Sequence, residues 1–147
     1  MKLISASLVL ASLFAVSPAF AGPPVTVSFK NVGTSTAASY KIITANEAST
    51  YTNASPKPTA TVAAGQTNTY NVTSLLSPDV NYANVRYKIG TKECVFVTTF
   101  VNALQPGGAK IPIWNKTATA SGGAICTATI TSVNPVTYAW TVSFTMK

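Results

Sequence analysis

The C-terminal segment of this chain alternates strictly between large apolar side chains and small or polar ones. The apolar positions are Val136, Tyr138, Trp140, Val142, Phe144 and Met146, and only threonine, serine and alanine lie between them. Neighbouring side chains of an extended chain point to opposite faces. A period of two over eleven residues therefore predicts a β-strand with one face against a core. We expect Trp140 to belong to that core.

The rest of the chain after residue 21 shows the same texture in shorter pieces. Further strands are expected at 25–32, 38–44, 49–52, 59–63, 67–73, 82–89, 92–101, 111–114 and 125–133. Glycine, proline and asparagine punctuate these pieces, and Gly90-Thr91 between two of them is typical of a tight hairpin. No stretch combines a 3.6-residue period with strong helix formers. The pattern predicts an all-β fold, a small antiparallel β-sandwich of the immunoglobulin-like or a related type, with a small barrel as the alternative.

The first 21 residues have the order of a secretory signal peptide. A short basic start (Met1-Lys2) precedes an apolar run, and Ala19-Phe20-Ala21 provides an A-x-A cleavage signal. We expect cleavage after Ala21 and a single mature β-sandwich domain at 22–147. No second long apolar stretch follows, so we expect no transmembrane segment in the mature chain. The compact signal is of a bacterial type, which predicts a secreted or periplasmic protein.

Two cysteines, Cys94 and Cys126, remain after that cleavage. In an exported chain, an even pair of cysteines is most simply a disulfide. A metal or redox site is disfavoured because the cysteines lack a C-x-x-C spacing and the chain has no histidine. We therefore expect one disulfide within the domain, and neither a metal nor another cofactor.

Acid–base chemistry has few residues available in this sequence. Histidine is absent, and the only acidic side chains are Glu47, Asp79 and Glu93. Each has a structural interpretation: Glu93 pairs with a nearby cation (Lys92, Lys88 or Arg86), Asp79 follows Ser-Pro in a turn, and Glu47 lies in a polar bend. Most hydrolytic and metal-dependent mechanisms rely on histidine or paired carboxylates. We therefore do not expect an enzyme.

The basic residues are better candidates for a functional role than the acidic ones. Without Lys2 the chain retains nine basic and three acidic side chains, a net charge of +6. Arg86 and Lys88 should share one face of a strand, Lys92 follows across the hairpin, and Trp114 precedes a polar turn. The candidate binding surface comprises Arg86, Lys88, Lys92, Lys110, Trp114 and Lys116. Such a surface attracts anionic lipid head groups, lipopolysaccharide or acidic glycans, and its plain alternative is a solvated strand face.

Three hypotheses about function follow. The first is a non-catalytic binding domain that contacts an anionic or glycan surface or a partner protein. The alternatives are a self-associating structural subunit of a pilus or surface fibre, and a small secreted membrane-active toxin. Nucleic acid is disfavoured as a partner by the export signal and by the absence of a basic run interleaved with aromatic residues.

Overall fold

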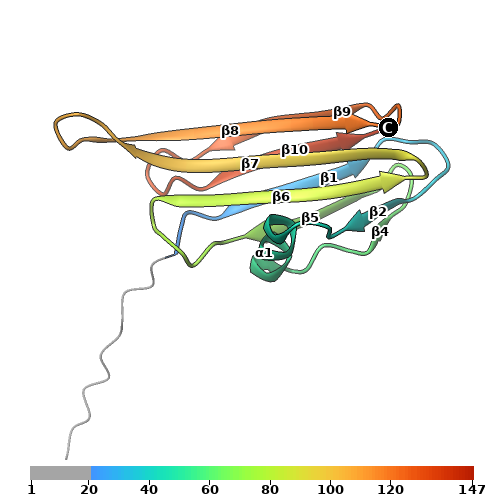
Figure 1. The fold of residues 1–147 in the computed structure, drawn as a ribbon, viewed down its shortest axis with the longest axis horizontal. Helices are drawn as coiled ribbons and strands as arrows, with labels where there is room; N and C mark the ends of the chain where they lie inside the picture. Colours follow the sequence, from blue (N-terminus) through green and yellow to red (C-terminus); the bar gives the residue numbers. More distant parts are fainter. Residues whose placement is uncertain (1–20) are drawn as a thin grey trace, which may run out of the picture.

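The computed structural model describes residues 21–147, and the expected signal peptide falls almost wholly outside them. The described part is mostly β-structure with one short helix. Figure 1 shows the arrangement. The strands are β1 (Val25–Asn31), β2 (Ala38–Lys41), β3 (Ala54–Ser55), β4 (Thr61–Val62), β5 (Thr67–Val72), β6 (Val80–Ile89), β7 (Lys92–Leu104), β8 (Lys110–Ser121), β9 (Cys126–Val133) and β10 (Trp140–Met146). The helix α1 is Ala45–Asn53. Within residues 21–147, no helix is long and apolar enough to cross a membrane.

The strands form two five-stranded sheets. The first has the order β3-β5-β1-β10-β9, and the second has the order β4-β2-β6-β7-β8. Neighbouring strands are antiparallel with one exception, because β1 and β10 run parallel with Val25 opposite Trp140. The expectation of a wholly antiparallel fold was therefore wrong at this pair. Its reason is topological: β1 and β10 come from opposite ends of the described chain, so no tight turn constrains their relative direction.

One apolar core lies between the two sheets. Alternate residues of the paired strands β1 and β10 are fully buried and face the second sheet. Aromatic rings contact across the core: Phe29 of the first sheet stacks on Tyr87 of the second with ring centroids 3.4 Å apart. Phe96 and Phe144 make a similar contact at 4.7 Å. Trp140 is 2% exposed, which confirms its predicted place in the core.

The segment 49–52 is helical, although its pattern suggested a strand. It lies in α1, whose N-cap residue Thr44 accepts a hydrogen bond from Glu47 N, while the Glu47 carboxylate accepts one from Thr44 N. This reciprocal capping box satisfies backbone donors that the first helical turn leaves without partners. The T-x-x-E sequence was therefore the helix signal, and the β-propensity of Thr50 and Thr52 was misleading.

Among the strand boundaries, those of β10 and β8 differ most from expectation. The strand β10 begins at Trp140 rather than Val136, because the Asn134 side chain accepts hydrogen bonds from Val136 N and Thr137 N and closes a turn there. In the other direction, β8 is twelve residues long rather than four. It pairs with β7 along its whole length, and the β7–β8 hairpin reaches beyond the other strands at one end of the molecule (Figure 1).

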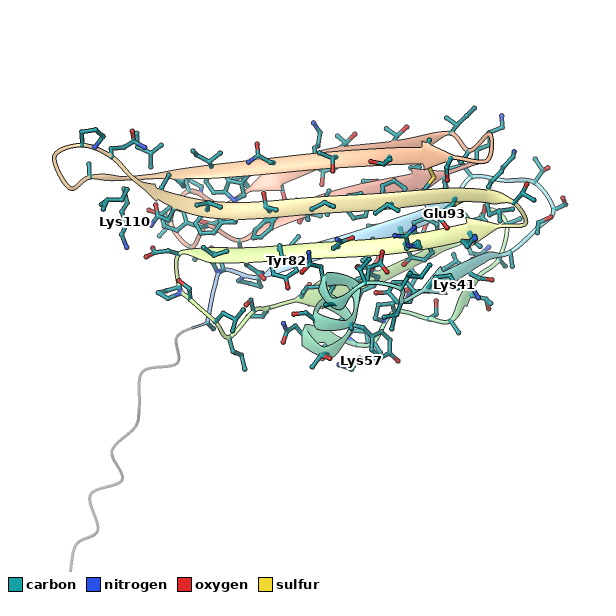
Figure 2. The ribbon with its side chains drawn as sticks, viewed as in Figure 1. Lys41, Lys57, Tyr82, Glu93 and Lys110 are labelled. Atoms are coloured by element: carbon teal, nitrogen blue, oxygen red, sulfur yellow. A yellow bond between two sulfur atoms is a disulfide. The ribbon has the colours of Figure 1, made fainter. Side chains whose placement is uncertain are left out.

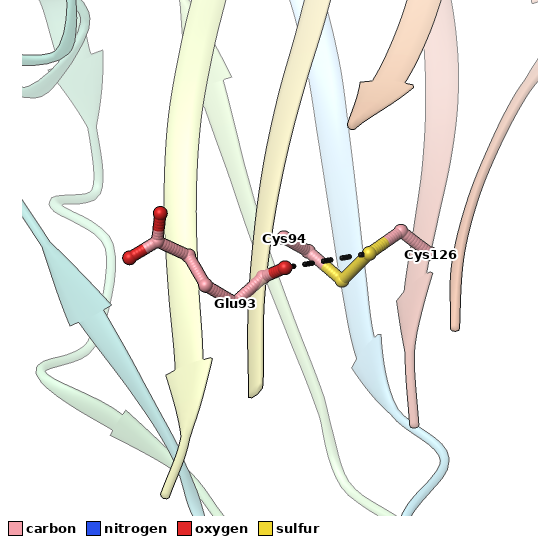
Figure 3. The surroundings of a disulfide bond; sticks show 3 residues. All are labelled: Glu93, Cys94 and Cys126. Carbon is pink, nitrogen blue, oxygen red and sulfur yellow. Dashed lines mark hydrogen bonds between the residues drawn. A yellow bond between two sulfur atoms is a disulfide. The ribbon is translucent and has the colours of Figure 1, made fainter. Parts of the chain in front are cut away.

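The expected disulfide between Cys94 and Cys126 is confirmed. It joins β7 of the second sheet to the first residue of β9 in the first sheet, with the two Cα atoms 5.8 Å apart (Figure 3). The nearby β8–β9 turn packs closely against the β6–β7 turn. Gly122 has a φ of +61°, and a Cβ atom at this position would overlap the carbonyl oxygen of Thr91. The disulfide and this contact together fix one end of the two sheets.

Candidate binding surface

The residues of the expected cationic surface lie at separate places on the second sheet. Arg86 and Lys88 lie on the outer face of β6, in the C-terminal half of that strand. Lys110 and Trp114 lie on β8 toward the opposite end, and Figure 2 shows Lys110 far from Glu93. Lys116 is in the middle of β8, and Lys92 begins β7. The structure therefore does not bring these residues together as one continuous group.

Arg86 is held between two carboxylates. Its Nε donates to Glu47 Oε1 at 2.9 Å, and its Nη1 pairs with Glu93 Oε1. The second oxygen of Glu93 pairs with Lys88 Nζ at 3.2 Å. The expectation that Glu93 pairs with a nearby cation is confirmed. Two cations face two carboxylates here, so the four side chains of this network carry no net charge.

Glu47 is the anchor of that network. Its side chain is fully buried, which corrects the expectation of a polar bend, and it also accepts hydrogen bonds from Ile43 N at 2.6 Å and Thr44 N at 3.0 Å. Burial alone would raise the pKa of Glu47. The backbone hydrogen bonds and Arg86 outweigh burial, so the pKa lies below its ordinary value. The carboxylate is therefore ionised and fully bonded, a structural tie between α1 and β6.

Lys110 and Trp114 are also engaged within the protein. Lys110 pairs with Asp79, and Asn102 Nδ2 donates to the same carboxylate at 3.0 Å. Hydrogen bonds from Lys110 and Asn102 lower the pKa of Asp79. Trp114 is half-buried: its indole N–H donates to Tyr138 O at 3.2 Å, and its ring lies 5.5 Å from that of Phe100. Its ring therefore packs against the end of the core.

All three acidic side chains are thus committed to ion pairs with cations of the expected surface. Within residues 21–147, the basic side chains that form no ion pair are Lys30, Lys41, Lys57, Lys92, Lys116 and Lys147. Lys57 donates to Tyr51 O at 2.8 Å and Thr52 O at 2.6 Å, where it neutralises the negative end of the α1 dipole. Of the five basic residues of the expected surface, Lys92 and Lys116 lack an acidic partner.

The described surface has at least three concave places. The largest, about 710 Å³, lies over the outer face of the first sheet and is lined by uncharged residues such as Thr26, Asn71 and Thr141. A groove of about 230 Å³ runs beside α1, between Asn46 and Tyr82. The third, about 180 Å³, opens at the end of the sheets where the β6–β7 turn lies. It is the one of the three that contains cations, Lys92 and Lys147.

The third cavity was missed in part by sequence reasoning. Lys92 was assigned to the binding surface, but Lys147 and the loop 33–36 that complete the cavity were not. The loop 33–36 follows β1, Lys92 begins β7 and Lys147 follows β10, and no local motif links them. In the described residues, no group of three or more Cys, Asp or Glu is placed to hold a metal ion.

Comparisons with protein-family models, with curated proteins and with solved structures find no match to this chain.

Proposed function

We propose that this protein is an exported, non-catalytic domain that binds an anionic partner. The observation that carries the proposal is the distribution of charge. Every acidic side chain is neutralised by an ion pair. Five lysines on the surface neither pair with an acidic side chain nor lie at the C-terminal end of α1, where Lys57 is bound. An uncompensated positive field of this kind attracts anions and accelerates their encounter with the surface.

The non-catalytic part of the proposal is supported by the state of the carboxylates. Glu47 and Glu93 are held by Arg86 and Lys88, and Asp79 is held by Lys110 and Asn102. A general base must be able to take a proton from a substrate, and the donors that lower the pKa of Glu47 and Asp79 make these two carboxylates weaker bases. A binding function does not require the three carboxylates to exchange protons, so their structural role is compatible with it.

Export is supported by the disulfide, which persists in oxidising compartments such as the periplasm. Two packed sheets joined by a disulfide are also features of an immunoglobulin-like sandwich, the fold type that we propose for the domain at 22–147. Such domains present their loops at the two ends of the sheets, and the unpaired Lys92 and Lys147 lie at one of those ends.

The proposal is tested by vesicle co-sedimentation of the protein expressed with its own first 21 residues and purified from the periplasm. Vesicles of phosphatidylcholine alone are compared with vesicles containing phosphatidylglycerol, at low and at physiological salt. We expect binding to the anionic vesicles that weakens as salt is raised. Absence of binding to anionic vesicles and to a sulfated polysaccharide matrix at low salt would contradict the proposal.

Membrane contact through the opposite end of the molecule is a second candidate, in keeping with a membrane-active role. Three loops there present aliphatic side chains: Leu75 and Leu76 are 71% and 80% exposed, Leu104 is 69% exposed and Val136 is 84% exposed. Asn102 N of β7 donates to Asp79 O at 2.8 Å, and the Trp114 indole N–H of β8 donates to Tyr138 O at 3.2 Å, so the first and third loops are tied to the β7–β8 hairpin at this end. Salt-independent binding to neutral vesicles that Leu76→Ser with Leu104→Ser abolishes would favour this candidate.

A further inference from the structure

We propose that the cavity between Lys92, Lys147 and the loop 33–36 binds a tetrahedral oxyanion, the phosphate or sulfate group of the anionic partner. This inference rests on the proposed function and gives it a site. The name "end cavity" is used below for the space lined by Gly33, Thr34, Ser35, Thr36, Ile89, Lys92 and Lys147.

The end cavity is lined by two lysine side chains and by no Asp or Glu side chain. Lys92 is half-buried and forms no ion pair, although its neighbour Glu93 forms two. The alternation of β7 explains why: Glu93 points to the outer face with Lys88, whereas Lys92 pairs with Ile89 on the face that looks between the sheets. Lys92 therefore lies on the opposite face of β7 from the Glu93 side chain. An ammonium group that pairs with no acidic side chain favours the arrival of an anion.

The loop 33–36 supplies neutral donors beside the two lysines. Its shape is set by Asn31, a fully buried residue of β1 whose Nδ2 donates to Thr36 O at 2.9 Å and to Val62 O at 3.0 Å. Asn31 Oδ1 accepts from Gly33 N at 2.9 Å. These bonds fix both ends of the loop and leave the Thr34, Ser35 and Thr36 side chains exposed at the cavity. Hydroxyl groups and ammonium groups together are the usual donors to phosphate oxygens.

The two lysine-bearing segments are held in place before any ligand arrives. Lys147 N donates to Ile125 O at 2.9 Å, and Ile125 N donates to Lys147 O at the same distance. Ile125 precedes Cys126, and Lys92 lies two residues before Cys94, so the disulfide connects the backbones that carry both lysines. When a site is ordered before the ligand binds, less conformational entropy is lost on binding and the affinity is higher.

The size of the end cavity limits its occupant to a small group. Its volume of about 180 Å³ corresponds to roughly six water molecules at about 30 Å³ each. That space accommodates a phosphate or sulfate group with some water, but not an extended segment of a polymer. The remainder of a lipid or glycan ligand would lie outside the end of the sheets.

The test uses inorganic phosphate and inorganic sulfate as probes, with binding followed by two-dimensional NMR of the periplasmic protein. We expect saturable shifts of the backbone amides of Thr34, Ser35 and Thr36, with phosphate binding weakened about tenfold in Lys92→Gln and again in Lys147→Gln, since each removes one close charge. The matched control is Lys41→Gln with Lys116→Gln, which has the same net charge as Lys92→Gln with Lys147→Gln and keeps the end cavity intact. Equal weakening in the two double variants, or no saturable shift, would overturn the inference.

The source of the oxyanion is distinguished by two further arms. The first measures binding to vesicles containing phosphatidic acid, and the second measures binding to a sulfated oligosaccharide. Stronger dependence on Lys92 and Lys147 than on Lys41 and Lys116 in either arm supports the end cavity and identifies its source. If both double variants lose vesicle binding equally, the end cavity is refuted while the proposed function stands. If the unaltered protein binds neither ligand, both proposals fail.

Discussion

Glu47 offers the sharpest test of how this fold is held together, because one carboxylate performs two structural tasks. It caps the first turn of α1 by accepting from Ile43 N and Thr44 N, and it binds Arg86 on β6. The helix makes a further contact through Thr50, whose hydroxyl accepts from Asn84 N at 2.9 Å. Truncation of Glu47 to alanine therefore leaves two backbone donors and one guanidinium group short of a partner.

The expected cost follows from these contacts. Loss of a capping interaction costs about 1 kcal/mol. Removal of one partner from a buried ion pair costs about 3–5 kcal/mol, and the lower end applies here because Arg86 retains Glu93. Because the two losses overlap in one carboxylate, we expect Glu47→Ala to lower the free energy of unfolding by about 3–4 kcal/mol. Glu47→Gln keeps the shape and one acceptor oxygen, so it should lower that free energy by about 1–2 kcal/mol.

Urea unfolding followed by tryptophan fluorescence measures both variants, and pH provides an internal control. The pKa of folded Glu47 lies below its ordinary value of 4.5. The stability that this depression contributes is therefore complete above the unfolded pKa and is lost as the pH falls through the folded pKa. The difference between the unaltered protein and Glu47→Gln should shrink below about pH 4.5. A Glu47→Ala cost under about 1 kcal/mol would refute this account, since even the cap alone should exceed it.

Three further outcomes are expected. Replacement of both Cys94 and Cys126 by serine should lower the free energy of unfolding by about 3–4 kcal/mol through loss of the cross-link, and an unchanged urea midpoint would contradict this. Gly122→Ala should lower the free energy of unfolding by at least about 2 kcal/mol, because the new Cβ atom would overlap the Thr91 carbonyl. Gly123 also has a positive φ but faces open space, so Gly123→Ala should lower it by about 1 kcal/mol. Equal urea midpoints of the two variants would exclude the steric explanation. Lys116 lies on the inner face of the edge strand β8, where it pairs with Thr98, and should oppose edge-to-edge pairing of two molecules. Lys116→Val should therefore shift the gel-filtration peak toward a dimer. A variant that stays monomeric would reject this role.

The core of the fold was accessible from the sequence because burial follows the strand period directly. Val142, Phe144 and Met146 alternate with polar residues, and each is fully buried. The disulfide was accessible because the chain offers one pairing of its two cysteines. The parallel direction of β1 beside β10 could not be predicted from the sequence. The alternation of a strand shows which face is buried and carries no information about the direction of its neighbour.

The candidate site was less accessible because its contacts join residues far apart in the chain. Glu47 and Arg86 are separated by 39 positions, and the local sequence suggested Lys92 as readily as Arg86 for Glu93. Sequence alone counts cations, whereas the structure shows which of them are already neutralised. Lys147 became a candidate only from the structure, in which it follows β10 and lines the same cavity as Lys92, the first residue after the β6–β7 turn.

The two candidate surfaces lie at opposite ends of the molecule, and this gives the two membrane hypotheses opposite geometries. The β7 strand runs between the two ends, and its thirteen residues span roughly 40 Å at about 3.3 Å per residue. A molecule upright on a flat bilayer therefore presents either the end cavity or the Leu76–Leu104 end, but not both. Inorganic phosphate should compete with vesicles for the first mode and leave the second unchanged. Binding that is anion-dependent yet indifferent to phosphate would instead place the partner on the dispersed lysines, outside either end.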